Sequence, residues 1–73
     1  MIDPDLSEYI NKQVVVTLDG SRKVKGTLKG YDLFMNIVLE SCVQIKENPI
    51  VLGTAVIRGE SVISCIPLTS TST

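Results

Sequence analysis

The sequence lacks histidine and tryptophan altogether, and it holds only two cysteines and one phenylalanine among 73 residues. Without histidine, and with Cys42 and Cys65 far apart, it offers no zinc-type ligand set and no imidazole for general-base work. It also lacks a nucleophile elbow and a Walker-type phosphate loop. Two cysteines without a secretory leader favour reduced thiols inside a cell. We therefore expect no metal, no cofactor, no small-molecule substrate and no catalytic activity.

Long apolar runs are absent too, because the longest are only strand-length, and we expect no membrane span. No strong charge of one sign is present: seven basic and eight acidic residues give a net charge of −1. This balance is not the global signature of a nucleic-acid-binding protein, so any contact with RNA must come from a local site. A domain of this size buries a modest fraction of its surface. With neither disulfide nor metal, we expect it to be stabilised by association with other chains.

The apolar spacing predicts one helix at the start of the chain, over about residues 3–11. Asp3 can accept hydrogen bonds as the N-cap, and Pro4 suits the first helical position. Leu6, Tyr9 and Ile10 form one apolar stripe that must pack on something.

Beyond the helix the period changes to two, which is typical of strands. We predict strands at about 13–18, 22–31, 34–46, 50–58 and 61–66. The inward-facing positions are predicted to be Val14, Val16, Leu18, Val24, Gly26, Leu28, Met35, Ile37, Leu39, Val43 and Ile45. Asp19-Gly20 predicts a two-residue hairpin turn, since both positions tolerate positive φ.

These elements predict a mainly β fold, in which an N-terminal α-helix precedes a strongly bent five-stranded antiparallel sheet. Gly26, Gly30 and Gly53 allow the strands to bend, so the sheet is a small open barrel. Its two bare edges invite pairing with another chain. We expect one domain over residues 1–68 and a disordered polar tail at 69–73.

The stretch GYDLFMNIVLE, residues 30–40, carries the candidate site. Strand alternation places Phe34 and Asn36 on one face, with Asp32 just ahead at the loop. An aromatic ring can stack on a base, and an amide can donate and accept along a base edge. Arg58 offers a second stacking wall, and Gly59 permits the tight turn that aims it inward. Taken singly, these residues are an Asx-turn acid, a core aromatic and a solvated charge; the set favours a base-binding site.

Two motifs in this order resemble the signatures of the Sm and Sm-like family. Gly26–Leu39 is similar to the first signature and Val56–Ile63 to the second, and the resemblance covers about residues 6–66. It implies the Sm fold, with an N-terminal helix on a bent five-stranded sheet. It also implies a ring, usually of seven subunits, in which the fourth strand of one subunit pairs with the fifth strand of the next.

The resemblance also implies a role for each candidate residue. Phe34 and Arg58 would sandwich one base, typically a uracil, whose edge Asn36 would hydrogen-bond. Asp32 would brace Asn36, and Gly59 would shape the turn behind Arg58. No metal or catalytic residue is implied.

The function so implied is that of a subunit in a heteroheptameric ring around a uridine-rich single-stranded site of spliceosomal small nuclear RNA. Such a ring acts in ribonucleoprotein assembly and pre-mRNA splicing, in the nucleus after cytoplasmic assembly. Two alternatives stay open: an Sm-like ring that binds oligouridine 3′ ends of spliceosomal or decaying messenger RNA, and a protein scaffold that does not contact RNA. The matched set of Phe34, Asn36 and Arg58 weighs against the scaffold.

Overall fold

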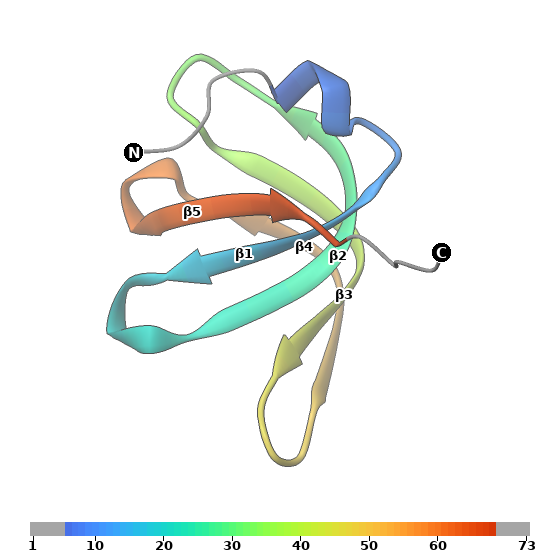
Figure 1. Ribbon diagram of the computed structural model, residues 1–73, viewed down its shortest axis with the longest axis vertical. Helices are drawn as coiled ribbons and strands as arrows, with labels where there is room; N and C mark the ends of the chain where they lie inside the picture. Colours follow the sequence, from blue (N-terminus) through green and yellow to red (C-terminus); the bar gives the residue numbers. More distant parts are fainter. Residues whose placement is uncertain (1–5, 69–73) are drawn as a thin grey trace.

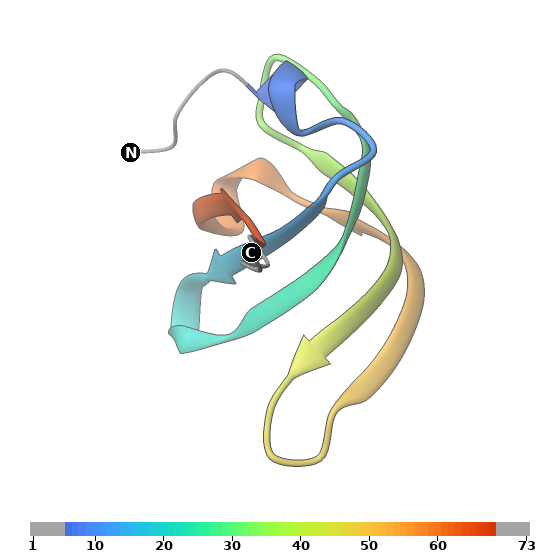
Figure 2. The same cartoon turned by 45° about the vertical axis from the view of Figure 1, so that its right-hand side comes forward.

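One antiparallel β-sheet makes up most of the protein, for which a computed structural model describes residues 6–68. Its strands are β1 (Gln13–Leu18), β2 (Lys23–Tyr31), β3 (Ile37–Ile45), β4 (Ile50–Ile57) and β5 (Val62–Pro67). They lie in the order β4-β3-β2-β1-β5, so β4 and β5 are the two edges. Figures 1 and 2 show how strongly the sheet curves. The expected bent, five-stranded antiparallel fold is confirmed.

The expected N-terminal helix is wrong within the described residues. A single 3-10 turn, η1 (Leu6–Tyr9), stands in its place. Asn11 then takes a φ of 66°, and its N–H donates to the Leu28 carbonyl at 2.7 Å instead of to a preceding turn. This bond ties the segment to β2 before a longer helix can form. The expected cap at Asp3, the role of Pro4 and the tail at 69–73 lie outside the described residues.

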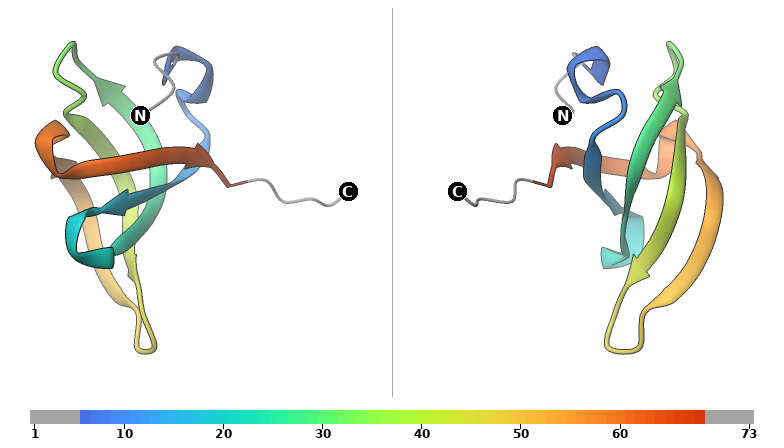
Figure 3. Two further views of the ribbon diagram at one scale, coloured as in Figure 1. Left: turned by 60° about the vertical axis from the view of Figure 1, so that its left-hand side comes forward. Right: turned by 90° about the vertical axis from the view of Figure 1, so that its right-hand side faces the viewer.

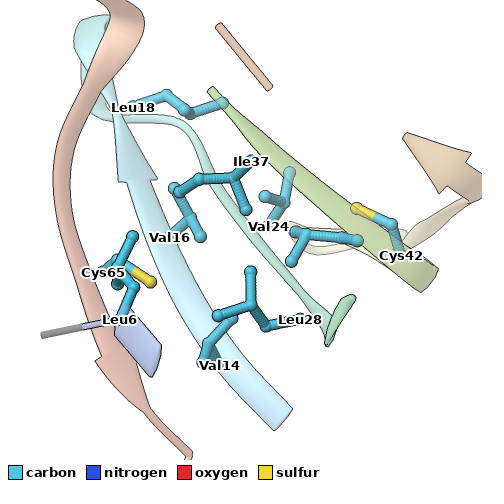
Figure 4. Close-up of a cluster of buried hydrophobic side chains, with 10 residues drawn as sticks. Leu6, Val14, Val16, Leu18, Val24, Leu28, Ile37, Cys42 and Cys65 are labelled. Atoms are coloured by element: carbon cyan, nitrogen blue, oxygen red, sulfur yellow. The ribbon is translucent and has the colours of Figure 1, made fainter. Parts of the chain in front are cut away.

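Alternation along β1 and β2 matches the expectation, since every second residue is buried. The core of the described chain consists of Leu6, Val14, Val16, Leu18, Val24, Leu28, Ile37, Leu39, Cys42 and Cys65. Figure 4 shows that these side chains come from η1 and from β1, β2, β3 and β5. Tyr9 and Ile10 pack against this cluster from the side of η1, as their apolar stripe predicts.

A bulge in β3 reverses which side chains face the core. Ser41 has a φ of 53°, and the pairing with β2 shifts register beside it. Cys42 is therefore fully buried, whereas Val43 is half-buried and pairs with Lys25, on the face opposite to Cys42. Ile45 follows Val43 onto that face and is 42% exposed. The expected inward placement of Val43 and Ile45 is wrong, because strict alternation does not survive a bulge.

The first hairpin turn also differs from its expected form. It is a three-residue 3-10 turn, η2 (Asp19–Ser21), closed by the Leu18 N–H on the Arg22 carbonyl at 2.7 Å. Positive φ falls on Gly20 and Ser21, at 73° and 65°, and not on Asp19. The turn therefore has three residues, and the two residues with positive φ lie one position later than the expected pair Asp19-Gly20.

The third strand begins later than expected, at Ile37 instead of 34. Residues 32–36 form a loop between β2 and β3, so the strand alternation assumed for Phe34 and Asn36 is wrong. Figure 3 shows this loop and the turn between β4 and β5 on the same side of the molecule. Two segments far apart in sequence thus meet, and the candidate residues lie on them.

Candidate nucleotide-binding site

The loop between β2 and β3 is held closed by the side chain of Asp32. Its Oδ1 accepts the backbone N–H groups of Phe34 at 2.9 Å and Asn36 at 3.0 Å. Backbone bonds add to this closure, because the Asp32 N–H donates to the Asn36 carbonyl and the Met35 N–H to the Asp32 carbonyl. Met35 takes a φ of 66° and packs against the core. The loop is an Asx-type turn with a fixed shape.

Asn36 has both ends of its amide fixed. Its Nδ2 donates to Asp32 Oδ2 at 3.0 Å, and its Oδ1 accepts the Gly59 backbone N–H at 2.7 Å. An amide carries two donor hydrogens and two acceptor lone pairs. One N–H and one lone pair of Asn36 therefore remain for a ligand, in an orientation that the protein sets.

The turn after β4 approaches the loop so closely that only glycine fits at position 59. A Cβ there would overlap the Phe34 carbonyl oxygen and lie 2.9 Å from the Met35 carbonyl carbon. Gly59 begins a 3-10 turn, η3 (Gly59–Ser61), closed by the Ser61 N–H on the Arg58 carbonyl at 3.0 Å. Arg58 therefore leaves the end of β4 directly beside the loop.

Phe34 and Arg58 present exposed side chains around a common hollow. The Phe34 residue and the Arg58 side chain are each 78% exposed. The hollow measures about 420 Å³ and is lined by Phe34, Met35, Asn36, Arg58, Gly59 and Glu60. A second hollow of about 700 Å³ is lined by Gly30, Tyr31, Asp32, Asn36, Val38, Val56 and Arg58. Asn36 and Arg58 belong to both hollows.

The carboxylate of Asp32 is stabilised in its charged form by this arrangement. The hydrogen bond from the Asn36 amide lowers the pKa of Asp32 below 3.8, and the backbone N–H groups of Asn36 and Phe34 act in the same direction. Partial desolvation opposes them. At neutral pH Asp32 is an acceptor only, and this fixes Asn36 Nδ2 as the donor between them.

All five residues singled out from the sequence are brought together: Asp32, Phe34, Asn36, Arg58 and Gly59. The predicted contact between Asp32 and Asn36 is present. The bond from Gly59 to Asn36 was not foreseen, because nothing in either motif alone indicates that the two segments touch. Glu60 was also missed, although its Oε2 lies 3.2 Å from Arg58 Nη2. The sequence does carry a signal for this ion pair, namely an acidic residue two positions after Arg58.

The structure also bears on metal binding and on membrane-spanning helices in the part of the chain that it describes. Among residues 6–68, no group of three or more His, Cys, Asp or Glu side chains could hold a metal ion. No helix in that range is long and apolar enough to cross a membrane. Cys42 and Cys65 are free and buried, and burial raises the pKa of both thiols.

The geometry of this site and a comparison with known proteins together identify the family of the chain. An open, bent sheet in which an exposed aromatic ring, an arginine and a fixed amide line one hollow fits a small nucleotide-binding module. Residues 4–67 match the LSM domain. The chain belongs to the LSM domain family.

Individual relatives agree with this assignment. The small nuclear ribonucleoprotein G of Schizosaccharomyces pombe is 52% identical over 62 residues, which cover 82% of this chain and 80% of that protein. The SmAP1 heptamer of P. aerophilum matches with a TM-score of 0.85 and 36% identity over 89% of both chains. The Sm protein of Pyrococcus abyssii, solved with a uridine heptamer, matches with a TM-score of 0.80 and 31% identity, covering 86% of this chain and 92% of the other.

Proposed function

We propose that this chain takes the place of the G subunit in a heteroheptameric Sm ring that encircles a uridine-rich single-stranded site of spliceosomal small nuclear RNA. The observation that carries the proposal is the fixed amide of Asn36, which lines one hollow together with Phe34 and Arg58. The similarity to a small nuclear ribonucleoprotein G and to a uridine-bound Sm protein supports it.

Uracil suits the groups that Asn36 leaves free. Its edge offers an N3–H donor beside carbonyl acceptors, so it can donate to the remaining lone pair of Oδ1 and accept from the remaining N–H of Nδ2. Cytosine has no hydrogen on N3, so in the same position it would oppose a lone pair to Oδ1, and it could use its N4–H donor only after shifting along its edge. Phe34 and the planar guanidinium of Arg58 stack on the two faces of the base, and such stacking contributes about 1–3 kcal/mol per base. Asp32 and Gly59 act indirectly, by holding Asn36 in place.

The ring supplies what a single subunit lacks. One hollow binds one base weakly, whereas several around a lumen bind a strand tightly. The two edge strands supply the contacts, because neither carries a charged side chain and both expose apolar residues. On β4 these are Ile50, Val51, Leu52 and Val56, and on β5 they are Ile63 and Ile66. The β4 edge of one subunit pairs with the β5 edge of the next.

The proposal also assigns a place in the cell. A subunit of a small nuclear ribonucleoprotein works in the nucleus in pre-mRNA splicing, and assembly of the ring on its RNA takes place in the cytoplasm. Its role there is binding, with no catalytic step.

Substitution at the two exposed walls tests the pocket. In rings reconstituted with the partner subunits, Phe34→Ala and Arg58→Ala should each weaken binding of oligouridine about ten-fold, the loss of roughly 1.4 kcal/mol of stacking. Arg22→Ala is the matched control, because Arg22 is also exposed and ion-paired, to Asp19 at 3.3 Å, but lies on the β1–β2 turn. Wild-type affinity in all three variants would refute the pocket.

Recovery of the native complex tests the identity of the ring. Tagged protein should co-purify with the other Sm core proteins and several spliceosomal small nuclear RNAs, read by mass spectrometry and sequencing. Sm-like partners with one spliceosomal RNA or decaying messages would assign the chain to an Sm-like ring. Protein partners without RNA would identify a scaffold and refute both RNA-binding proposals.

A further inference from the structure

Glu60 is the one charged residue lining the smaller hollow that the pocket described above does not use. Its Oε2 lies 3.2 Å from Nη2 of Arg58, and both side chains are largely exposed, at 73% and 78%. The two residues flank Gly59, whose position is dictated by its close approach to Phe34. The short η3 turn therefore brings the two residues close enough to form this ion pair.

A guanidinium can bind RNA through phosphate or through a base, and the ion pair with Glu60 affects these two modes differently. Its N–H donors lie in the plane of the group and bind phosphate oxygens, whereas its faces stack on bases. Glu60 forms an ion pair with Nη2, so it offsets the positive charge that would attract a phosphate to Arg58. A carboxylate beside the guanidinium also competes directly with a phosphate for those donors.

The local charge points in the same direction. The two hollows are lined by the carboxylates of Asp32 and Glu60 and by one guanidinium, that of Arg58. The excess is one negative charge, which repels a phosphate group. Such surroundings suit the uncharged face of a base and disfavour the backbone.

We propose that Glu60 is a specificity-determining residue that shields Arg58 from phosphate and so reserves its guanidinium for stacking on a base. The inference rests on the proposed RNA-binding function and deepens it. Without Glu60, Arg58 would attract the backbone of any single strand, so binding would depend less on the base and more on salt.

The salt dependence of binding is the measurement that distinguishes these modes. For single-stranded nucleic acid, the slope of log K against log salt is about −0.7 for each phosphate neutralised. In the ring reconstituted with its partner subunits, Glu60→Gln should steepen the slope for oligouridine by about 0.7. The ratio of affinities for oligouridine and oligocytidine should fall about two- to five-fold, which is the range that an exposed ion pair can supply.

Asp19→Asn is the matched control. It makes the same change in net charge and releases Arg22, an exposed arginine paired to Asp19 at 3.3 Å, but on the β1–β2 turn. This variant should keep the wild-type slope and ratio. Because Glu60 is exposed, Glu60→Gln is expected to fold and assemble, and circular dichroism and native mass spectrometry check both.

Each outcome has a distinct meaning. Slopes that are the same in wild type, Glu60→Gln and Asp19→Asn would overturn the role of Glu60. Weaker binding of both oligonucleotides by Glu60→Gln with an unchanged slope would also overturn it, because Glu60 would then hold Arg58 in position without excluding phosphate. A wild-type ring that does not bind oligouridine would instead refute the proposed function itself.

Discussion

The backbone N–H of Gly59 donates to Oδ1 of Asn36 at 2.7 Å, across 23 residues of sequence. This bond joins the loop after β2 to the turn after β4, which carry the two sequence signatures. It is partly buried, and it fixes the amide of Asn36 together with the bond from Nδ2 to Asp32. Asn36 is therefore both a structural link and a candidate ligand for a base.

The double role of Asn36 predicts that its loss affects stability as well as binding. Asn36→Ala leaves the Gly59 N–H without its acceptor, and an unsatisfied, partly buried donor costs about 1–3 kcal/mol. Thermal unfolding of the purified protein should show a lower Tm than wild type, whereas Asn48→Ala, an exposed position between β3 and β4, should not. An unchanged Tm would mean that water replaces Asn36 at Gly59. Arg58→Ala, at an exposed side chain, is the cleaner test of RNA binding.

The close approach of Gly59 to the backbone of Phe34 and Met35 predicts that Gly59→Ala lowers the stability of the protein. The new Cβ would meet backbone atoms of Phe34 and Met35, which cannot move aside as a flexible side chain can. We expect a loss of about 1–3 kcal/mol in the free energy of unfolding, as for other overpacked sites. Gly30→Ala is the control, because the nearest atoms to its Cβ are 4.0 Å away and belong to the Val38 side chain. Equal loss at both positions would contradict a specific contact at Gly59.

Asp32 predicts an acid-sensitive loop. Its pKa in the folded protein lies below the ordinary value of 3.8, chiefly because of the hydrogen bond from Asn36. A depressed pKa contributes stability that is fully present above the unfolded value and is lost as the pH falls through the folded value. The Tm of wild type should therefore fall more steeply below pH 4 than that of Asp32→Asn, whose side chain does not titrate. At neutral pH Asp32→Asn should be less stable, because it presents a second donor to Asn36 Nδ2.

Glu47→Gln serves as the control for this titration, since Glu47 is an exposed acid between β3 and β4. Its curve of Tm against pH should follow that of wild type through the acid range. Parallel curves for wild type and Asp32→Asn would show that the Asp32 carboxylate does not stabilise the loop.

How far the sequence predicts the fold can be judged strand by strand. In β1 and β2 the period of two runs without interruption, so the buried positions were predicted correctly from Val14 to Leu28. In β3 it fails at Ser41, where positive φ makes a bulge, and serine carries no signal for that backbone conformation. The N-terminal helix fails for a tertiary reason: Asn11 bonds to Leu28 on β2, a contact that no local pattern encodes.

The site shows the same division. That Asp32, Phe34, Asn36, Arg58 and Gly59 lie together was predictable, because two motifs resembling one family occur in order. The placement of Phe34 and Asn36 on a strand was wrong, since the side chain of Asp32 captures their backbone N–H groups and closes a loop instead. Local hydrogen bonds from aspartate compete with strand pairing, and composition alone does not decide between them.

The exposed edge of β4 gives the final prediction, on assembly. Val51 is an apolar residue on this edge strand and is 78% exposed. A charged side chain on an edge disfavours pairing with another chain, so Val51→Lys should reduce ring formation with the partner subunits while leaving the fold of the chain intact. Native mass spectrometry of co-expressed subunits measures the ring, and circular dichroism checks the fold. Asn48→Lys adds the same charge in the connection before β4 and should assemble normally. Full assembly of Val51→Lys would mean that this part of β4 does not form the contact between subunits, and pairing would then have to rest on the segment nearer Val56.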